Sequence, residues 1–171
     1  MERPRHFLPV APLTAAAFAA YGDVIEASEQ ATPRTINGGF ALRYHDLAQV
    51  DVTNSGGRPA ISIFRARPRA MPFQLQRMER HPLGSQAFMP LNARPFLVVV
   101  APPGADLAPG QIRCFRAAGH QGVNYARGAW HHPLIAITAQ SDFLVVEQRA
   151  DPGQPNLETV VVAGASLWVT V

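Results

Sequence analysis

Short apolar segments separated by turn-forming residues make up most of this chain. Segments rich in Val, Ile, Leu and Phe alternate with Gly, Pro, Asn and Asp, and 16 prolines and 13 glycines are consistent with many tight turns. Strands punctuated in this way are typical of a β-sandwich or a β-barrel. We therefore expect an all-β fold, with strands at residues 23–27, 39–47, 60–66, 73–79, 86–91, 96–101, 112–117, 134–139, 142–148 and 167–171.

The start of the chain predicts one short helix, over residues 14–21. Thr14 suits the N-cap of the sequence AAAFAAY, because its hydroxyl can accept a hydrogen bond from a free backbone N–H. Gly22 is well placed to end that helix. A chain of 171 residues has the size of one domain, and it shows no internal repeat or linker. We expect a single domain spanning residues 1–171.

The charged residues exclude some functions. All 15 basic residues are arginines, so the chain has no lysine amine to form a Schiff base with a carbonyl substrate or pyridoxal phosphate. The net charge of +3 comes from scattered arginines, and the one cluster, RARPR at residues 65–69, is too short for a nucleic-acid-binding stripe. We therefore expect a small anionic substrate as the partner, and no nucleic acid.

One cysteine and one apolar stretch indicate the cellular compartment of the protein. Cys114 cannot form an internal disulfide, which is typical of a reducing compartment, and the alternation in IRCFRA predicts that it lies in the core. The stretch FLPVAPLTAAAFAA follows two arginines, but Pro9 and Pro12 interrupt it, unlike a secretory signal. No other apolar run approaches the length of a membrane span. We expect a cytoplasmic protein without a membrane partner.

A first polar cluster lies in the sequence MERHPLGSQ. Glu79 and His81 are two residues apart and share one face of a strand, whereas Arg80 points to the other face. Gln86 opens the next predicted strand. A carboxylate, an imidazole and an amide can therefore converge inside a barrel, although a salt-bridged surface turn is an alternative interpretation.

A second polar cluster lies in the sequence GVNYARGAWHHPL. Asn124, Tyr125 and Arg127 offer hydrogen-bond donors just before the paired histidines. His131 and His132 are neighbours on an extended chain and point to opposite faces, so only one of them can enter a given pocket. Two polar clusters at turn-to-strand junctions can build a site at the mouth of a barrel.

Both clusters resemble the cupin pattern, H-x-H with a downstream Glu and then P-x-G-x-x-H. The sequence ARGAWH matches the second motif, with Ala126 in place of Pro and His131 at the ligand position. In the first motif Glu79 replaces the first His, His81 matches the second, and Gln86 replaces the Glu. The resemblance implies that these four side chains can hold a divalent cation with one weak, neutral ligand.

Several longer blocks resemble the ureidoglycolate lyase family of allantoin catabolism, a part of purine breakdown. They include PLTAAAFAAYGDVIE, RYHDLA, MERHPLGSQAFMPL, GVNYARGAWHHPL and DFLVVEQ, and they run in order between residues 12 and 148. The resemblance implies a cupin-like double-stranded β-helix, or jelly-roll barrel, in a homodimer. It also implies cleavage of (S)-ureidoglycolate to glyoxylate and urea. Some members are called ureidoglycolate hydrolases, and nickel is sometimes associated with the family, so the hydrolytic reaction and the metal requirement stay open.

The chemistry of this substrate suggests roles for the clustered residues. Cleavage of a hemiaminal needs a base for the hydroxyl proton and an acid for the departing nitrogen, and needs no nucleophile. His81 and His131 are the predicted catalytic histidines, and Glu79 moves a proton or orients His81. The predicted contacts to substrate are Gln86, Asn124 and Tyr125 for the ureido or hydroxyl group, Arg43 and Arg127 as competitors for the carboxylate, and His132 at the rim or as support.

Two other classes of function remain open on the sequence. A metal-dependent cupin isomerase or oxygenase is one, although Gln86 at the Glu position counts against it. A non-catalytic cupin that binds a ligand is the other, although no DNA-binding module is attached.

Two apolar segments bear on the assembly of the protein. The segments FLVVVA and LIAITA are apolar on both sides, and a dimer would cover the second face of each.

Overall fold

The computed structural model describes residues 4–28, 30–104, 106–149, 153–162 and 166–171, and it is built almost entirely of strands. The all-β prediction is confirmed. The one α-helix is α1 (Ala15–Phe18), and three single 3₁₀ turns are η1 (Asn37–Gly39), η2 (Asn54–Gly56) and η3 (Pro109–Gln111). The strands are β1 (His6–Phe7), β2 (Val10–Pro12), β3 (Gly22–Ile25), β4 (Arg34–Ile36), β5 (Ala41–Arg43), β6 (Arg58–Ala66), β7 (Phe73–Gln74), β8 (Arg77–Arg80), β9 (Gln86–Pro90), β10 (Phe96–Ala101), β11 (Arg113–Ala117), β12 (Gly122–Tyr125), β13 (Trp130–His131), β14 (Ile135–Ala136), β15 (Ser141–Arg149), β16 (Glu158–Val161) and β17 (Leu167–Val169).

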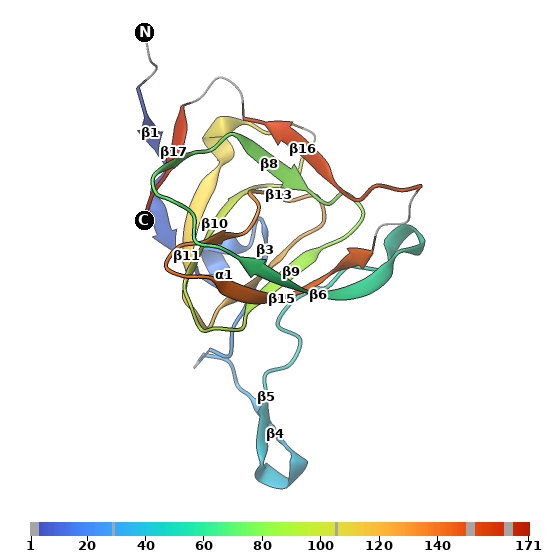
Figure 1. Ribbon diagram of the computed structural model, residues 1–171. Helices are drawn as coiled ribbons and strands as arrows, with labels where there is room; N and C mark the ends of the chain where they lie inside the picture. The colour runs from blue at the N-terminus through green and yellow to red at the C-terminus, as the bar shows by residue number, and fades with distance from the viewer. Residues whose placement is uncertain (1–3, 29, 105, 150–152, 163–165) are drawn as a thin grey trace.

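Two sheets face each other and form a jelly-roll barrel of the cupin type (Figure 1). The first sheet has the order β16-β8-β13-β10-β11-β2, with β14 also paired to β10, and the second has the order β3-β12-β9-β15-β6. The chain crosses repeatedly between the sheets. For example, β8 and β10 belong to the first sheet, whereas β9, which lies between them in the sequence, belongs to the second. The other strands of the two barrel sheets pair antiparallel, whereas β2 pairs with β11 in parallel and β1, outside the barrel, pairs with β17 in parallel.

Two smaller pieces lie outside the barrel. A cover sheet, β1-β17-β7, brings the start and the end of the chain side by side (Figure 1). The hairpin of β4 and β5 projects away from the barrel at the bottom of the same view. In the part of the chain that the structure describes, no helix is long and apolar enough to cross a membrane.

Two layers of apolar side chains hold these pieces together. The inner core lies between the two barrel sheets and includes Phe88, Val98 and Phe143. The outer core lies between the first sheet and the cover sheet and includes Leu97, Cys114 and Leu167. Cys114 is a core residue as predicted, and burial raises the pKa of its thiol to about 12.

The strand β10 explains why the sequence FLVVVA is apolar throughout. Phe96, Val98 and Val100 enter the inner core, whereas Leu97 and Val99 enter the outer core. The second face of this strand is therefore covered by the N- and C-terminal strands of the same chain. Likewise, Ile135 in LIAITA belongs to the outer core. The argument from these two segments for a dimer was wrong, because the chain covers both of them itself.

The predicted helix is present but shorter than expected. Thr14 caps α1 and its hydroxyl accepts a hydrogen bond from the backbone N–H of Ala17 at 3.2 Å. The helix ends at Phe18, and Gly22 does not terminate it. Gly22 instead begins β3 with a φ of 144°, and an added Cβ would meet the backbone oxygen of Asn124 at 1.9 Å, so the close approach of β12 requires glycine here.

Three predicted strands differ from the observed ones. Residues 39–47 contain only the short β5, because positive φ angles at Gly39 and Asp46 turn the chain at both ends. Residues 73–79 divide into β7 and β8, which belong to different sheets. Residues 134–139 contain only the two-residue β14. The strands β1, β2, β4, β12, β13 and β16 were not predicted from the sequence.

Candidate active site

Glu79, His81 and His131 meet at the junction of β8 and β13. These strands are antiparallel neighbours, and Glu79 lies directly opposite His131 in the register. The Glu79 Oε1 atom is 3.6 Å from the His131 Nε2 atom, and the centroids of the His81 and His131 rings are 5.3 Å apart. One ligand atom from each of the three side chains lies within 4.8 Å of the others. The prediction that Glu79 and His81 share a face and converge with His131 is confirmed.

Backbone carbonyls fix the protonation of both imidazole rings. The Nδ1 atom of His81 is 2.6 Å from the carbonyl oxygen of Asn156, and the Nδ1 atom of His131 is 3.1 Å from that of Ala129. A carbonyl oxygen can only accept, so each Nδ1 carries the hydrogen and donates it. In the neutral ring the Nε2 atom then holds a lone pair, and both Nε2 atoms are buried without a hydrogen-bond partner among the described residues. Such orphaned acceptors are unusual in a protein interior and are typical of a site that binds something.

Burial controls the charges in this cluster. Burial, followed by the neighbouring His81, lowers the pKa of His131 to about 3, so His131 is neutral at pH 7. Burial raises the pKa of Glu79, an effect that His81 and Arg77 partly oppose. The raised pKa makes the protonated carboxylic acid easier to form than in an exposed glutamate. The cluster thus combines a neutral His131 with a second imidazole, His81, and one carboxyl group that can hold a proton.

A cavity of about 320 Å³ opens beside the cluster between the two sheets. Glu79, Gln86 and His131 supply its polar wall, and apolar side chains such as Phe88 and Leu134 supply much of the rest. Tyr125 supports the wall, because its ring stacks on the ring of His131 with centroids 4.2 Å apart and planes 9° apart. The cavity has the mixed lining of a site for a small polar molecule.

Gln86 is held in this cavity by a residue that the sequence analysis missed. The Gln86 amide nitrogen donates a hydrogen bond to a Glu147 carboxylate oxygen at 2.8 Å, and Gln86 and Glu147 are register partners on β9 and β15. The Gln86 Oε1 atom is left buried without a hydrogen-bond partner among the described residues. Alternation along β15 could have identified Glu147, because Phe143 and Val145 on the same face lie in the inner core.

His132 points away from the cavity, as the alternation of an extended chain predicts. Its ring packs against Phe73, with centroids 5.4 Å apart, on the outer-core side. Its Nδ1 donates to the carbonyl oxygen of Pro133, and its Nε2 is 3.4 Å from a guanidinium nitrogen of Arg69. Burial lowers the pKa of His132 to about 4. That His132 contacts a substrate stays a prediction. The position of its ring on the outer-core side, away from the cavity, does not support it.

Three other predicted contacts lie outside the cavity. Arg43 is on the projecting hairpin of β4 and β5 (Figure 1). Asn124 points outward from β12 and donates hydrogen bonds to Asp23 and to the backbone oxygen of Gln49. Arg127 lies 3.7 Å from a carboxylate oxygen of Asp51 and lines a separate cavity with Asn124. The structure does not bring these residues to the histidine pair, so their predicted roles lack support from its geometry.

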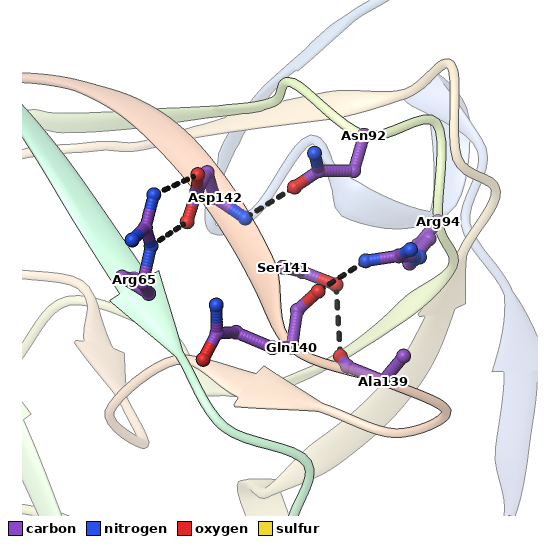
Figure 2. A network of polar contacts seen from close by, with 7 residues as sticks. All are labelled: Arg65, Asn92, Arg94, Ala139, Gln140, Ser141 and Asp142. Atoms are coloured by element: carbon purple, nitrogen blue, oxygen red, sulfur yellow. Dashed lines mark hydrogen bonds and ion pairs between the residues drawn. The ribbon is translucent and has the colours of Figure 1, made fainter.

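Two further arginines near the site are committed elsewhere. Arg80 points outward as predicted, pairs with Glu158 and lies over the Trp130 ring at 4.4 Å. Arg65 lines the cavity, but its guanidinium makes two hydrogen bonds to the carboxylate of Asp142, as Figure 2 shows. The backbone N–H of Asp142 in turn donates to Asn92, so this network fixes the β15 end of the second sheet.

Comparison with known proteins agrees with the geometry. The chain matches the family model described as ureidoglycolate lyase over residues 5–169. It is 52% identical to the ureidoglycolate lyase of Burkholderia mallei (strain NCTC 10229), over 95% of this chain and 93% of that protein. It is 55% identical to the ureidoglycolate lyase of Brucella melitensis biotype 2, over 88% of this chain and 87% of that protein. A solved structure, a mutant of the 3,4-ketoisomerase QdtA from Thermoanaerobacterium thermosaccharolyticum, is 9% identical with a TM-score of 0.44, covering 82% of this chain and 86% of that one.

Proposed function

Because this chain belongs to the ureidoglycolate lyase family, we propose that it splits (S)-ureidoglycolate into glyoxylate and urea. The observation that carries the proposal is the pair of buried, unpartnered Nε2 atoms close to the Glu79 carboxyl group, beside a cavity for a small molecule that Glu79 and His131 line. The identity to proteins named for this activity extends over nearly the whole chain, which supports the same reaction here.

The protein has to supply only acid and base groups for this reaction. Ureidoglycolate carries a hydroxyl, a carboxylate and a urea nitrogen on one carbon. Removal of the hydroxyl proton forms the carbonyl of glyoxylate, the carbon–nitrogen bond breaks, and the nitrogen keeps the electron pair and takes a proton to become urea. Such a step needs a base and an acid in fixed positions, without a nucleophile and without consumption of water.

The three clustered side chains supply both partners. An Nε2 lone pair of His81 or His131 accepts the hydroxyl proton, since both rings keep their hydrogen on Nδ1. Glu79, whose pKa is raised by burial, delivers a proton to the departing nitrogen and regains one across its contact with His131. The unpartnered Oε1 atom of Gln86 accepts a hydrogen bond from the ureido group, and Tyr125 keeps the His131 ring in place.

The same side chains fit a divalent cation. Two imidazole Nε2 atoms and a carboxylate are common ligands of nickel or zinc, and each Nδ1 donates to a backbone carbonyl, as metal-binding histidines usually do. We propose that His81, His131, Glu79 and the Gln86 oxygen would hold such an ion, in which case the Nε2 atoms would be ligands and would not accept the hydroxyl proton. When bound, the ion would polarise the hydroxyl oxygen and ease loss of its proton.

The products of racemic ureidoglycolate test the proposed reaction. Purified protein is expected to release glyoxylate and urea in equal amounts, to consume one enantiomer, and to release no ammonia. The measurement is a parallel assay of glyoxylate, urea and ammonia over time, with urease activity excluded by adding urea alone. Ammonia released in step with glyoxylate would mean that the ureido carbonyl is hydrolysed instead, and no glyoxylate at all would reject the activity.

We also propose that the chain forms a homodimer through the outer face of β6. This strand is nine residues long and ends the second sheet, with β15 as its one partner among the described residues. Ile61 and Ile63 on its outer face are 74% and 55% exposed, and the adjoining outward residues Leu144 and Val146 are also apolar. The outward side chains of β6 and β15 form an exposed apolar face, which a second copy of the chain can cover across a two-fold axis.

Light scattering tests this assembly. The protein is expected to have twice the 18.5 kDa mass of one chain at micromolar concentration. Ile63→Arg should yield the single-chain mass, because the charge cannot be buried in the interface. Val161→Arg is the matched control, since Val161 is 72% exposed on β16 of the other sheet, and it should stay dimeric. A monomeric wild type, or dissociation of the Val161 variant alone, would contradict the proposed interface.

A further inference from the structure

The two ends of the Gln86 amide have different surroundings. Its nitrogen donates a hydrogen bond to a Glu147 carboxylate oxygen at 2.8 Å, whereas its Oε1 atom is buried without a hydrogen-bond partner among the described residues. The side chain is only 4% exposed and lines the cavity together with Glu79 and His131. A buried amide oxygen without a donor is unfavourable, so this atom is suited to a donor that a bound molecule supplies.

Glu147 determines which end of that amide is left for a bound molecule. A carboxylate can only accept hydrogen bonds, so it pairs with the NH₂ end of Gln86. Turning the amide round would place its oxygen against the carboxylate, with two acceptors in contact and no hydrogen between them. The orientation with Oε1 directed away from Glu147 is therefore the stable one. Gln86 thus offers an acceptor, and not a donor, to a molecule in the cavity.

The second sheet holds this pair beside the reacting groups. Tyr125, Gln86 and Glu147 are register partners on β12, β9 and β15, so their side chains form one row on the same face of the sheet. That face is the inner one, because Phe88, two residues from Gln86, belongs to the inner core. Tyr125, on one side of Gln86, stacks on the ring of His131. Glu147, on the other side, does not line the cavity and acts on a bound molecule through Gln86.

The ureido group of the substrate matches an acceptor at this position. It ends in an NH₂ group, which donates hydrogen bonds, and in a carbonyl oxygen, which accepts them. The Gln86 oxygen therefore pairs with the NH₂ group. A molecule with a methyl group in place of that NH₂ leaves the buried oxygen without a donor, and a site built for a hydrogen bond rejects such an analogue.

We propose that Glu147 is a positioning residue that sets the specificity for a ureido group, because it fixes the Gln86 amide with its oxygen toward the bound molecule. This inference rests on the proposed cleavage of ureidoglycolate. It takes the Gln86 oxygen as a contact of the substrate and not as a metal ligand.

Binding of two analogues that cannot be cleaved tests this selection. Ureidoacetate is the substrate without its hydroxyl, so it cannot release urea, and N-acetylglycine carries a methyl group in place of the terminal NH₂. Calorimetry on the wild type is expected to show that ureidoacetate binds about 10-fold or more tightly than N-acetylglycine. Glu147→Gln should reduce that preference to about 3-fold or less, because an amide can hold Gln86 either way round. Its affinity for N-acetylglycine should be unchanged, which would show that the fold is kept.

A second substitution shows whether Glu147 acts through Gln86. Gln86→Leu removes the acceptor and should abolish the preference, and adding Glu147→Gln to that variant should change the preference no further. Glu158→Gln is the matched control, because the Glu158 carboxylate pairs with Arg80 and does not line this cavity. The control should keep the preference of the wild type.

Three results would overturn the inference: a wild type that does not bind ureidoacetate more tightly, a Glu147→Gln variant that keeps the full preference, or one that loses affinity for both analogues equally. The last result would mean that Glu147 supports the fold only. A preference that is present in the wild type and lost in Glu147→Gln, in a protein that releases no glyoxylate from ureidoglycolate, would reject the proposed reaction and keep the inference.

Discussion

Replacing His131 with alanine is expected to lower kcat for ureidoglycolate cleavage by about 10²-fold or more, the usual scale for loss of a positioned acid or base. His131 is the central member of the cluster, because it contacts Glu79 at 3.6 Å and packs between the rings of His81 and Tyr125. Its removal eliminates one of the two Nε2 acceptors and the group with which Glu79 shares a proton. The measurement is the initial rate of glyoxylate release at saturating substrate.

A second substitution guards against simple unfolding. His131 is only 2% exposed, so alanine leaves a cavity in the barrel, whereas His131→Gln fills most of that space without an imidazole. Both variants should lose turnover to a similar extent, and the glutamine variant should melt nearer to the wild type. A folded His131→Gln variant with normal kcat would show that His131 takes no part in proton transfer.

Replacing His132 with alanine is expected to act on stability. The ring is 4% exposed and packs against Phe73, and loss of a buried ring of this kind costs about 2 kcal/mol or more. For a chain of this size that loss lowers Tm by roughly 4–8 °C. The kcat should stay within a few-fold of wild type, since the ring lies on the outer-core side of the first sheet.

Thermal melts followed by circular dichroism measure this effect, with His45→Ala as the control. His45 is an exposed histidine, so its removal should leave Tm unchanged within about 1 °C. An unaltered melting temperature in His132→Ala would mean that the ring does not support the outer core in the way the contacts indicate.

Local alternation was enough to predict the centre of the site. Glu79 and His81 share a face because they are two residues apart, whereas the resemblance to the cupin motif G-x-x-H assigned His131 to the same interior. These relations depend on the short-range geometry of a strand, which the sequence displays directly. The cupin motifs then related the two strands, although β13 is too short to be recognised from its own residues.

The wrong and the missing assignments have different causes. Asn124, which was predicted to contact the substrate, faces outward because it alternates with the inward-facing Tyr125, and it donates a hydrogen bond to the backbone oxygen of Gln49. Glu147 reaches the site because β15 pairs with β9, a contact between segments far apart in sequence.

The most direct test of the account is a side-by-side comparison of His131→Ala and His132→Ala, with kcat and Tm measured on the same preparations. The two substitutions are chemically identical and one residue apart, but the His131 ring lines the cavity and the His132 ring lies on the outer-core side of the first sheet. The account predicts that His131→Ala loses about 10²-fold or more in kcat and that His132→Ala keeps its kcat and melts at a lower temperature. A folded but inactive His132→Ala variant beside a fully active His131→Ala variant would contradict it and place the site on the other face of the strand.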